Sequence, residues 1–393
     1  MGASELQLVS KGEHDKVLTD NPEITFFKVL YRKHANFSIE SSKLGMNQEN
    51  ILLGNTVNCT IPRRGDMLNK IYIEIEISNI SELDTVIINH LGFSMLKTVS
   101  IEIGGQTITK HTGEWLHIWN ELTEPSSKRQ GIDEMVGTKT TLISGGSTRL
   151  YIPLQFWFCR NNGLSLPLIA LQYHEVKINI ELEKKIYDEG ENDISNKLKI
   201  NSLELILDYI FLDTDERIKF AESQHEYLIE QVQHSGSEFV ELRAPDGTGN
   251  QEPCTNHHSL NIHMNHPIKE LVWVVKKTDK NVFEFYEHND ASIVLNGHPR
   301  QAKRKGEYYS KVQTYQHHTN IPTGDTNSIH VFSFAFKPEL VQPTGSCNFS
   351  KINKAQLFLK TRPEDCIKVI NVYGLSLNIF RIVSGMGGIV FEN

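Results

Sequence analysis

Histidines and cysteines are the residues of this chain with the greatest capacity for chemistry. The sequence holds 17 histidines and 5 cysteines, and several lie close together. The densest groups are Cys254, His257, His258, His263 and His266, and the pair His317 and His318. A structural zinc site needs about four such ligands on a rigid frame, in spacings such as CxxC or HExxH. Neither group has such a spacing, so we interpret both as loop or packing residues and predict no metal site.

Motifs for catalysis and for cofactor binding are incomplete as well. His225 and Glu226 begin like HExxH, but Ile229 stands where the second histidine should be. The chain has neither a GxSxG elbow nor a glycine-rich phosphate loop that ends in Lys-Ser or Lys-Thr. The glycine-rich run 384–388 has no helix after it, so we interpret it as a terminal turn. We therefore predict no catalytic residue and no cofactor.

Two charged patterns have both a chemical and a structural interpretation. Glu74 and Glu76 point to one face of a strand, where paired carboxylates could act as acid and base. Solvated strand faces carry the same pattern far more often, and we favour that interpretation. The basic run 300–305 (RQAKRK) could meet phosphate or an acidic surface, but a solvated loop is our default expectation.

The stretch 150–182 combines two apolar alternating runs with the residue types of a site. Cys159, Arg160, Asn161, Asn162 and His174 lie between the two runs. The stretch could be the centre of an enzyme or the corner of a β-sandwich. A matching stretch at 331–360 repeats the two runs at the same spacing but carries different residues between them. Chemistry would not tolerate that exchange, so we predict a corner that is used twice.

Length, charge and cysteine content limit the class of protein. A chain of 393 residues is too long for one ordinary core and suggests two domains. The net charge of −8 argues against a general nucleic-acid binder. The chain has no CxxC pair, so a disulfide framework is not indicated. The N-terminus lacks the apolar core of a secretory signal, and no apolar run is long enough to span a bilayer. We expect a soluble protein of a reducing compartment.

Alternation of apolar and polar residues dominates the chain and predicts antiparallel strands with one wet face. The clearest strands are expected at 71–77, 99–103, 203–207, 331–336, 355–359 and 375–379. Helical patterns are few: a short helix is predicted at 112–122, and a longer one at 213–231 with Asp213 as its cap. The second helix lies in the middle of the chain and could connect two domains.

An internal repeat is the most informative feature of the sequence. Segments 67–75, 100–108, 152–158, 175–182 and 205–212 resemble 267–275, 292–300, 331–337, 354–360 and 375–382, in that order. The offsets shrink steadily from 200 through 192, 179 and 179 to 170. We infer two copies of one β-domain, both sandwiches or jelly rolls, of which the second has shorter loops. Large aromatic residues beside the loops suit oligomer interfaces, which favours a building block.

Long motifs across both halves of the chain resemble those of a known protein family. They include NPEITFFKVLYRKHANFSIE (21–40), IGGQTITKHTGEWLHIWNELT (103–123), LDTDERIKFAESQHEYLIEQVQ (212–233), FSFAFKPELVQPTGSCNFSKI (332–352) and FRIVSGMGGIVFEN (380–393). In these motifs and their order the chain resembles the major capsid proteins of nucleocytoplasmic large DNA viruses, the group that includes phycodnaviruses, iridoviruses and mimivirus relatives. The resemblance extends from about residue 21 to the last residue.

The resemblance implies an all-β fold of two tandem eight-stranded antiparallel jelly rolls with a few short helices. The expected division is an N-terminal arm 1–24, a first jelly roll 25–212, and a second jelly roll 213–393 that begins with the helix at about 213–231. The segment 21–40 would lie on the inner side of the capsid, and the loops at 125–147 and 185–200 would form short outer towers.

The resemblance also implies the function and the partners. The chain would be a structural, non-catalytic subunit of an icosahedral capsid and would form pseudo-hexagonal homotrimers, with no direct sequence-specific contact to nucleic acid. Partners would be further copies, neighbouring capsomers, minor capsid proteins and, indirectly, an internal membrane. Its place would be the virion, assembled in the host cytoplasm. Two alternatives remain open from the residues: a tandem jelly-roll protein that binds or acts on carbohydrate, and a metal-dependent enzyme of the cupin type.

Overall fold

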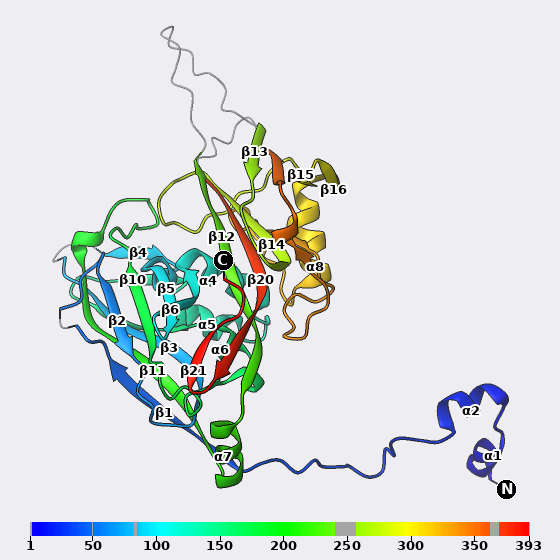
Figure 1. Cartoon of the computed structure of the whole chain (residues 1–393). Coiled ribbons are helices and arrows are strands. Elements are labelled where there is room, and N and C mark those ends of the chain that lie inside the picture. Colours follow the sequence, from blue (N-terminus) through cyan, green and yellow to red (C-terminus); the bar gives the residue numbers. More distant parts are fainter. Residues whose placement is uncertain (1, 49, 82–84, 240–256, 362–368, 393) are drawn as a thin grey trace. The chain divides into compact units, whose positions relative to one another are not determined.

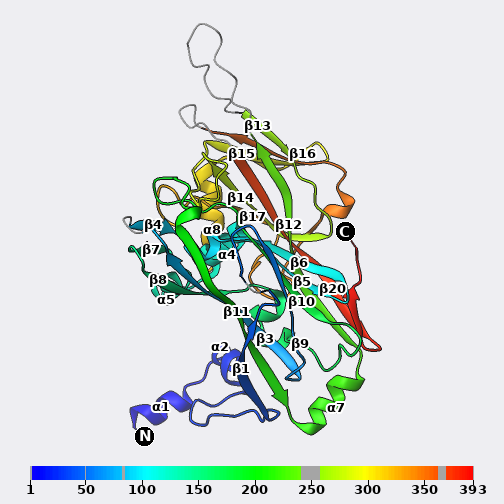
Figure 2. The same cartoon turned by 90° about the vertical axis from the view of Figure 1, so that its left-hand side faces the viewer.

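The computed structural model describes the chain except for residues 1, 49, 82–84, 240–256, 362–368 and 393 (Figures 1 and 2). The chain divides into two compact units, Met1–Asn36 and Phe37–Asn393. The described part of the first unit contains the helices α1 (Ala3–Val9) and α2 (Glu13–Thr19), and all of its residues are exposed. The first strand begins at Phe37, so the segment from 25 to 36 is not yet part of a sandwich.

The first half of the larger unit forms a β-sandwich. One sheet has the order β1 (Phe37–Gly45), β11 (Leu198–Leu212), β3 (Met67–Asn79) and β8 (Ser147–Pro153), with β9 (Leu166–Pro167) also paired to β3. The other sheet has the order β2 (Thr56–Thr60), β10 (Val176–Leu182), β5 (Leu96–Ile103) and β6 (Gln106–Thr112). A small two-stranded sheet joins β4 (Val86–Asn89) and β7 (Lys139–Leu142).

The second half repeats this sandwich strand for strand. One sheet has the order β12 (His225–Phe239), β20 (Val369–Val383), β14 (Pro267–Lys276) and β17 (His330–Ser333); β18 (Cys347–Asn348) pairs with β14, and β21 (Met386–Ile389) with β20. The other has the order β13 (His257–Asn261), β19 (Ala355–Lys360), β15 (Asp290–Leu295) and β16 (His298–Lys305). All five pairs of segments matched in the sequence occupy equivalent strands. The predicted repeat and its antiparallel sheets are therefore confirmed.

The strand alternation explains where the core lies. Ile71, Ile73, Ile75 and Ile77 of β3 point into the first sandwich and are at most 1% exposed. In the second sandwich β14 is apolar on both faces: Trp273 and its alternate neighbours fill the sandwich core, whereas Val272 and Val274 join the core cluster of the first half. A strand buried on both faces is a sign that the two sandwiches pack against each other, and this packing makes residues 37–393 one compact unit.

Short helices connect the strands of the larger unit. They are α3 (Leu91–Ser94), α4 (Gly113–Thr123), α5 (Arg129–Val136), α6 (Trp157–Arg160), α7 (Thr214–Glu222) and α8 (Gln313–His317), which continues a π-helical turn at Tyr308–Val312. The helix predicted at 112–122 is confirmed as α4, since Thr112 caps it by accepting a hydrogen bond from the Trp115 amide at 3.0 Å. In the described part of the chain, no helix has the length and apolar character to cross a membrane.

Three local predictions were wrong in their extent. The helix at 213–231 ends at Glu222, because the following residues pair with β20 as strand β12, where Ile229 is fully buried. The apolar run at 150–156 leaves the sheet after Pro153, and its continuation is helix α6. The basic run 300–305 is not a loop but lies in β16, an exposed edge strand on which charges discourage unwanted strand pairing.

Candidate functional site

The junction between the two sandwiches holds the most elaborate polar network of the described residues. Glu114 lies in the first turn of α4 and is buried against the second sandwich. Its carboxylate pairs with the Lys276 ammonium at 2.9 Å and accepts hydrogen bonds from Asn371 at 2.6 Å and from the Tyr373 hydroxyl at 2.9 Å. Burial alone would raise the pKa of Glu114, but Lys276, Asn371 and Tyr373 outweigh burial and lower it. The charged pair therefore joins the sandwiches as ions.

Aromatic packing and a second ion network join the sandwiches beside α6. The Trp157 ring lies 5.7 Å from that of Phe380 on β20, measured between ring centroids. Arg160 pairs with Glu230 of β12, which also pairs with the buried Lys269. The Arg160 guanidinium also lies over the Trp119 ring of α4, 4.1 Å from its centroid. Trp119, Arg160 and Glu230 help to line a cavity of about 370 Å³ between the sandwiches.

The corner residues at 159–174 belong to these structural contacts. Cys159 is buried, and burial raises the pKa of its thiol to about 12, which makes it a poor nucleophile. Asn161 caps the following turn by accepting from the Gly163 amide at 2.7 Å. The His174 ring Nδ1 lies 2.9 Å from the carbonyl oxygen of Gly387 and so anchors the C-terminal hairpin. The stretch is therefore a corner that carries the junction.

A buried histidine with two carboxylates stabilises the second sandwich. His318 Nε2 lies 3.0 Å from Glu270 Oε2, and its Nδ1 lies 3.0 Å from Glu339 Oε1. Burial disfavours the charged ring, yet the two carboxylates outweigh burial and raise the pKa of His318 to about 9. The imidazolium thus fastens the loop that carries Glu339 to β14. The neighbouring His317 only contacts a carbonyl oxygen, that of Phe336, at 3.0 Å.

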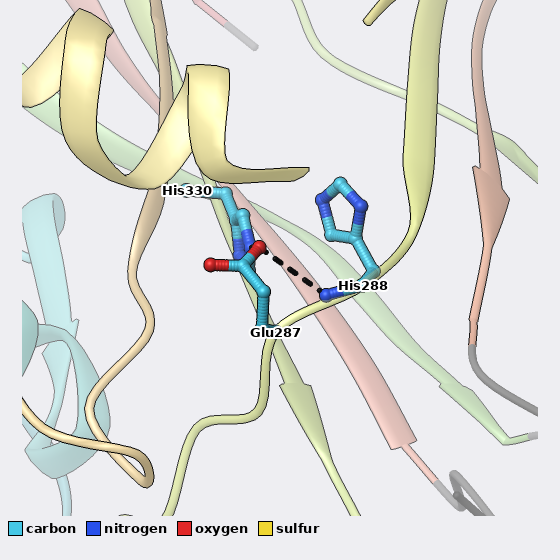
Figure 3. A group of neighbouring side chains, drawn as sticks. All are labelled: Glu287, His288 and His330. Atoms are coloured by element: carbon cyan, nitrogen blue, oxygen red, sulfur yellow. Dashed lines mark hydrogen bonds and ion pairs between the residues drawn. The ribbon is translucent and has the colours of Figure 1, made fainter. Parts of the chain in front are cut away.

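Glu287, His288 and His330 form the one group among the described residues whose ligand atoms lie close enough to suggest a metal ion (Figure 3). His330 Nε2 lies 2.7 Å from the Glu287 carboxylate, and Nδ1 of both rings is buried without a hydrogen-bond partner in the described chain. However, His288 Nε2 accepts a hydrogen bond from the Trp273 indole at 3.2 Å.

That hydrogen bond makes His288 a poor metal ligand. A neutral ring that accepts at Nε2 carries its proton on Nδ1, so Nδ1 has no lone pair for a metal. Moving the proton would place two N–H groups face to face, and binding at Nε2 would displace Trp273, which is fully buried. We therefore assign the group to the packing of the second sandwich, where the His288 and His330 rings stack at 4.1 Å.

The remaining candidates from the sequence are dispersed. Cys254 lies outside the described residues, His257 and His263 are exposed, and His258 lies 3.3 Å from the Thr361 hydroxyl. His225 and Glu226 stand on β12, where Glu226 pairs with Arg381. Glu74 and Glu76 both pair with Arg149 of β8, and Glu74 also pairs with Lys43 of β1. The two carboxylates therefore brace the sheet and are not free for acid–base work.

Sequence reasoning did not single out the apolar surface at either edge of the larger unit. Phe336 after β17 is 82% exposed, with Tyr315 and Leu340 nearby in the fold and also exposed. On β1, Phe37 and Ile39 are 52% and 57% exposed.

Comparisons with known proteins agree with this picture of a structural chain. Residues 25–213 match the family model for the major capsid protein N-terminus, and residues 216–388 match the model for the large eukaryotic DNA virus major capsid protein. The major capsid protein of Pyramimonas orientalis virus is 40% identical over 420 residues and covers all of both chains. That of Paramecium bursaria Chlorella virus 1 is 34% identical and covers 98% of this chain and 99% of its own.

Solved structures show the same relation. The crystal structure of PBCV-1 VP54 matches with a TM-score of 0.82 and 30% identity, over 94% of this chain and all of that one. The Faustovirus major capsid protein, at 11% identity, shares the fold over 95% of this chain and 94% of its own with a TM-score of 0.72. The chain has the double jelly-roll fold, it belongs to the major capsid proteins of large eukaryotic DNA viruses, and it is a structural subunit of the capsid.

Proposed function

We propose that three copies of this chain form a homotrimeric capsomer in which six jelly rolls surround one axis in pseudo-hexagonal order. The observation that carries the proposal is the strand-for-strand repeat, because each chain then supplies two similar wedges. Six similar wedges around an axis tile a flat facet although only three chains are present. Such capsomers would join into facets through many contacts that are individually modest.

The oligomeric state tests this proposal directly. Sedimentation of the purified chain should give a particle of three times the mass of the chain that does not dissociate on dilution, and electron micrographs should show pseudo-hexagonal outlines. A stable monomer at micromolar concentration contradicts the proposal.

The proposal also includes the domain boundaries and the tower loops. Residues 1–24 would be an arm, 25–212 the first jelly roll and 213–393 the second. The support is that the strands of the first sandwich end at Leu212 and those of the second begin at His225. The short tower loops would be 125–147, which contains α5, and 185–200.

The N-terminal unit is proposed to contact other components of the shell: neighbouring capsomers, minor capsid proteins and, through them, an internal membrane. Its support is an exposed apolar run in which Phe26, Phe27 and Tyr31 are 90%, 97% and 83% exposed. Deletion of residues 1–36 should leave trimers intact but prevent their association into larger sheets. Normal sheet formation by the truncated chain would contradict this role.

We also propose that the protein has no enzymatic activity and is assembled into virions in the host cytoplasm. The support is chemical, since the paired carboxylates Glu74 and Glu76 are held in ion pairs and His288 is turned away from metal binding. Purified protein should show neither a thermal shift nor hydrolysis across a broad glycan panel, and no stoichiometric metal. Turnover of a glycan or a bound stoichiometric metal would contradict it.

A further inference from the structure

Three buried side chains at the junction of the sandwiches carry the groups that are needed to join an amine to an amide. Lys276 has a primary amine, Asn371 a carboxamide and Glu114 a carboxylate. The three residues are 4%, 6% and 6% exposed. An amine, a carboxamide and a base enclosed together are the components of an amide exchange, in which one nitrogen replaces another on the same carbonyl carbon.

Strand pairing brings the lysine and the asparagine to the same place. Lys276 is the last residue of β14 and Asn371 lies near the start of β20, the antiparallel neighbour of β14. Val274 is the register partner of Asn371, and Lys276 lies two residues further along β14, so the side chains of Lys276 and Asn371 share one face. Diagonal neighbours on one face of a sheet are within reach of a long side chain.

Glu114 of the first sandwich contacts the reacting nitrogen of both residues. Its Oε2 lies 2.9 Å from Lys276 Nζ, and its Oε1 accepts a hydrogen bond from Asn371 Nδ2 at 2.6 Å. The Tyr373 hydroxyl donates to Oε1 at 2.9 Å and so fixes the position of the carboxylate. One carboxylate therefore holds the nitrogen that would attack and the nitrogen that would leave, which is the placement required of a shared acid and base.

Burial favours the proton transfer that has to come first. The Lys276 ammonium becomes a nucleophile only when it loses a proton. Burial raises the pKa of Glu114, whereas Lys276 and the hydrogen bonds from Asn371 and Tyr373 lower it. Transfer of one proton from Nζ to Oε2 removes both charges, and an interior of low dielectric favours that neutral pair. The same residues line a cavity of about 260 Å³, which gives space for a small leaving group.

We propose that Lys276 and Asn371 form an isopeptide bond within the chain, with Glu114 as the catalytic acid and base. Nζ attacks Cγ of Asn371, and the bond between Cγ and Nδ2 breaks. The attacking nitrogen loses two protons in total, and the departing nitrogen gains two through Glu114 and leaves as an ammonium ion. The lysine ammonium and the carboxamide thus become a secondary amide and an ammonium ion, and the Glu114 carboxylate is regenerated. No oxidant, reductant or further reactant is needed.

This bond goes beyond the proposed function and is compatible with it. It would join β14 and β20 covalently beside the contact between the two sandwiches. It forms once in each chain without turnover, so it does not make the protein an enzyme. Because both residues belong to one chain, the bond does not depend on the trimer, and failure of either proposal leaves the other standing.

Mass spectrometry of the purified and denatured full chain tests the inference. The linked chain should be lighter than its sequence by the mass of one ammonia molecule. Trypsin should cleave the denatured chain after Lys269, which is 0% exposed in the folded chain, but not after Lys276. The digest should contain a branched peptide that joins the segment with Lys276 to the segment with Asn371. A chain of unchanged mass that is cleaved after Lys276 overturns the proposal.

Two conservative variants separate the chemistry from the folding of the chain. Lys276→Arg keeps a positive charge beside Glu114, but a guanidinium group stays protonated and does not attack. This variant should have the full mass of its sequence. Glu114→Gln should slow bond formation by about 100-fold or more, because the base is lost. The linked fraction in samples taken at intervals after synthesis measures the rate, and far-UV circular dichroism should show that both variants are folded. An unchanged rate in Glu114→Gln overturns the assigned mechanism.

Lys269→Arg is the matched control. Lys269 is also buried and also pairs with a carboxylate, that of Glu230, but its other contact is the backbone carbonyl oxygen of Leu340 at 2.9 Å. This variant should lose ammonia just as the unmodified chain does. Loss of ammonia that persists in Lys276→Arg, or that occurs without the branched peptide, would mean that an asparagine cyclises on its own backbone. Either result overturns the proposal.

Discussion

The two sandwiches have the same strand order, yet the segments that follow the equivalent strands β8 and β17 place aromatic residues in opposite environments. The position after β8 is a buried tryptophan, Trp157, and the position after β17 is an exposed phenylalanine, Phe336. The strand pattern is local and is shared by both repeats, whereas burial depends on what lies next to each sandwich. Trp157 packs against the second sandwich through Phe380, whereas Phe336 is 82% exposed.

The polar residues of the two corners also differ in whether their ion-pair partners lie in the other sandwich or in their own. Arg160 pairs across the junction with Glu230 of the other sandwich. In the second corner, Glu339 pairs with His318 inside its own sandwich. The first corner therefore joins two sandwiches, and the second braces one. Four measurements test this difference.

Loss of the Glu114 carboxylate should have the largest effect on the free energy of unfolding. Glu114→Ala leaves the buried Lys276 without its partner, and the free energy of unfolding should fall by about 3–5 kcal/mol. Urea denaturation followed by circular dichroism measures the change. The double variant Glu114→Ala/Lys276→Met removes the orphaned charge and should recover part of the loss. An effect of Glu114→Ala below about 1 kcal/mol would show that the network does not hold the junction.

Truncation of Trp157 after β8 and of Phe336 after β17 should separate a buried from an exposed aromatic residue most directly. Trp157→Ala should cost at least about 3 kcal/mol, because it opens a cavity against Phe380. Phe336→Ala should change the free energy of unfolding by less than about 0.5 kcal/mol in a single chain. Both are measured by urea denaturation followed by circular dichroism. Equal costs would contradict the contrast between the two corners.

Rising pH should weaken the interaction of His318 with its two carboxylate partners in the second corner. The pKa of His318 is raised to about 9 in the folded chain, from an unfolded value of about 6.5. Its contribution is fully present below pH 6.5 and is lost as pH rises through 9; the total is on the order of 3 kcal/mol. Stability should therefore fall between pH 6.5 and 9, and His318→Gln should flatten this part of the profile. An unchanged slope in the variant would exclude His318 as its source.

Glycine substitutions at the hairpin turns should have small effects on stability. Gly105 and Gly297 have φ values of +86° and +81° in the two equivalent turns, with open space around each added Cβ. Alanine at either position should cost about 1 kcal/mol from backbone strain alone. Gly104→Ala should cost more, because its Cβ would collide with the His174 ring that anchors the C-terminal hairpin. Thermal unfolding of the three variants measures the difference. Equal losses of stability would mean that the His174 ring moves aside without a measurable cost.

Much of the fold followed from local pattern. The alternation at 71–77 predicted β3, Thr112 with its following apolar residues predicted α4, and the ordered offsets predicted two equivalent sandwiches. The helix predicted at 213–231 was too long, because Leu228 and Ile229 fit the spacing of a helix as well as that of a strand. Pairing with β20, which lies near the other end of the second half, decided the matter.

The candidate sites were harder to judge from the sequence. The stretch 150–182 was correctly interpreted as a corner, but the sequence could not tell that Arg160 meets Glu230 or that His174 meets Gly387. The Glu287, His288 and His330 group was not anticipated, since His330 lies far from the other two in the sequence. Side chains brought together by long-range contacts leave no spacing to recognise.

The sequence by itself determined the strands, their duplication and the family, because alternation, turns and long motifs are local properties of the chain. Only the tertiary structure decided which apolar residues are buried at the junction and which remain on the surface. The physical reason is that burial requires a partner surface: Trp157 has one in Phe380, whereas Phe336 is 82% exposed.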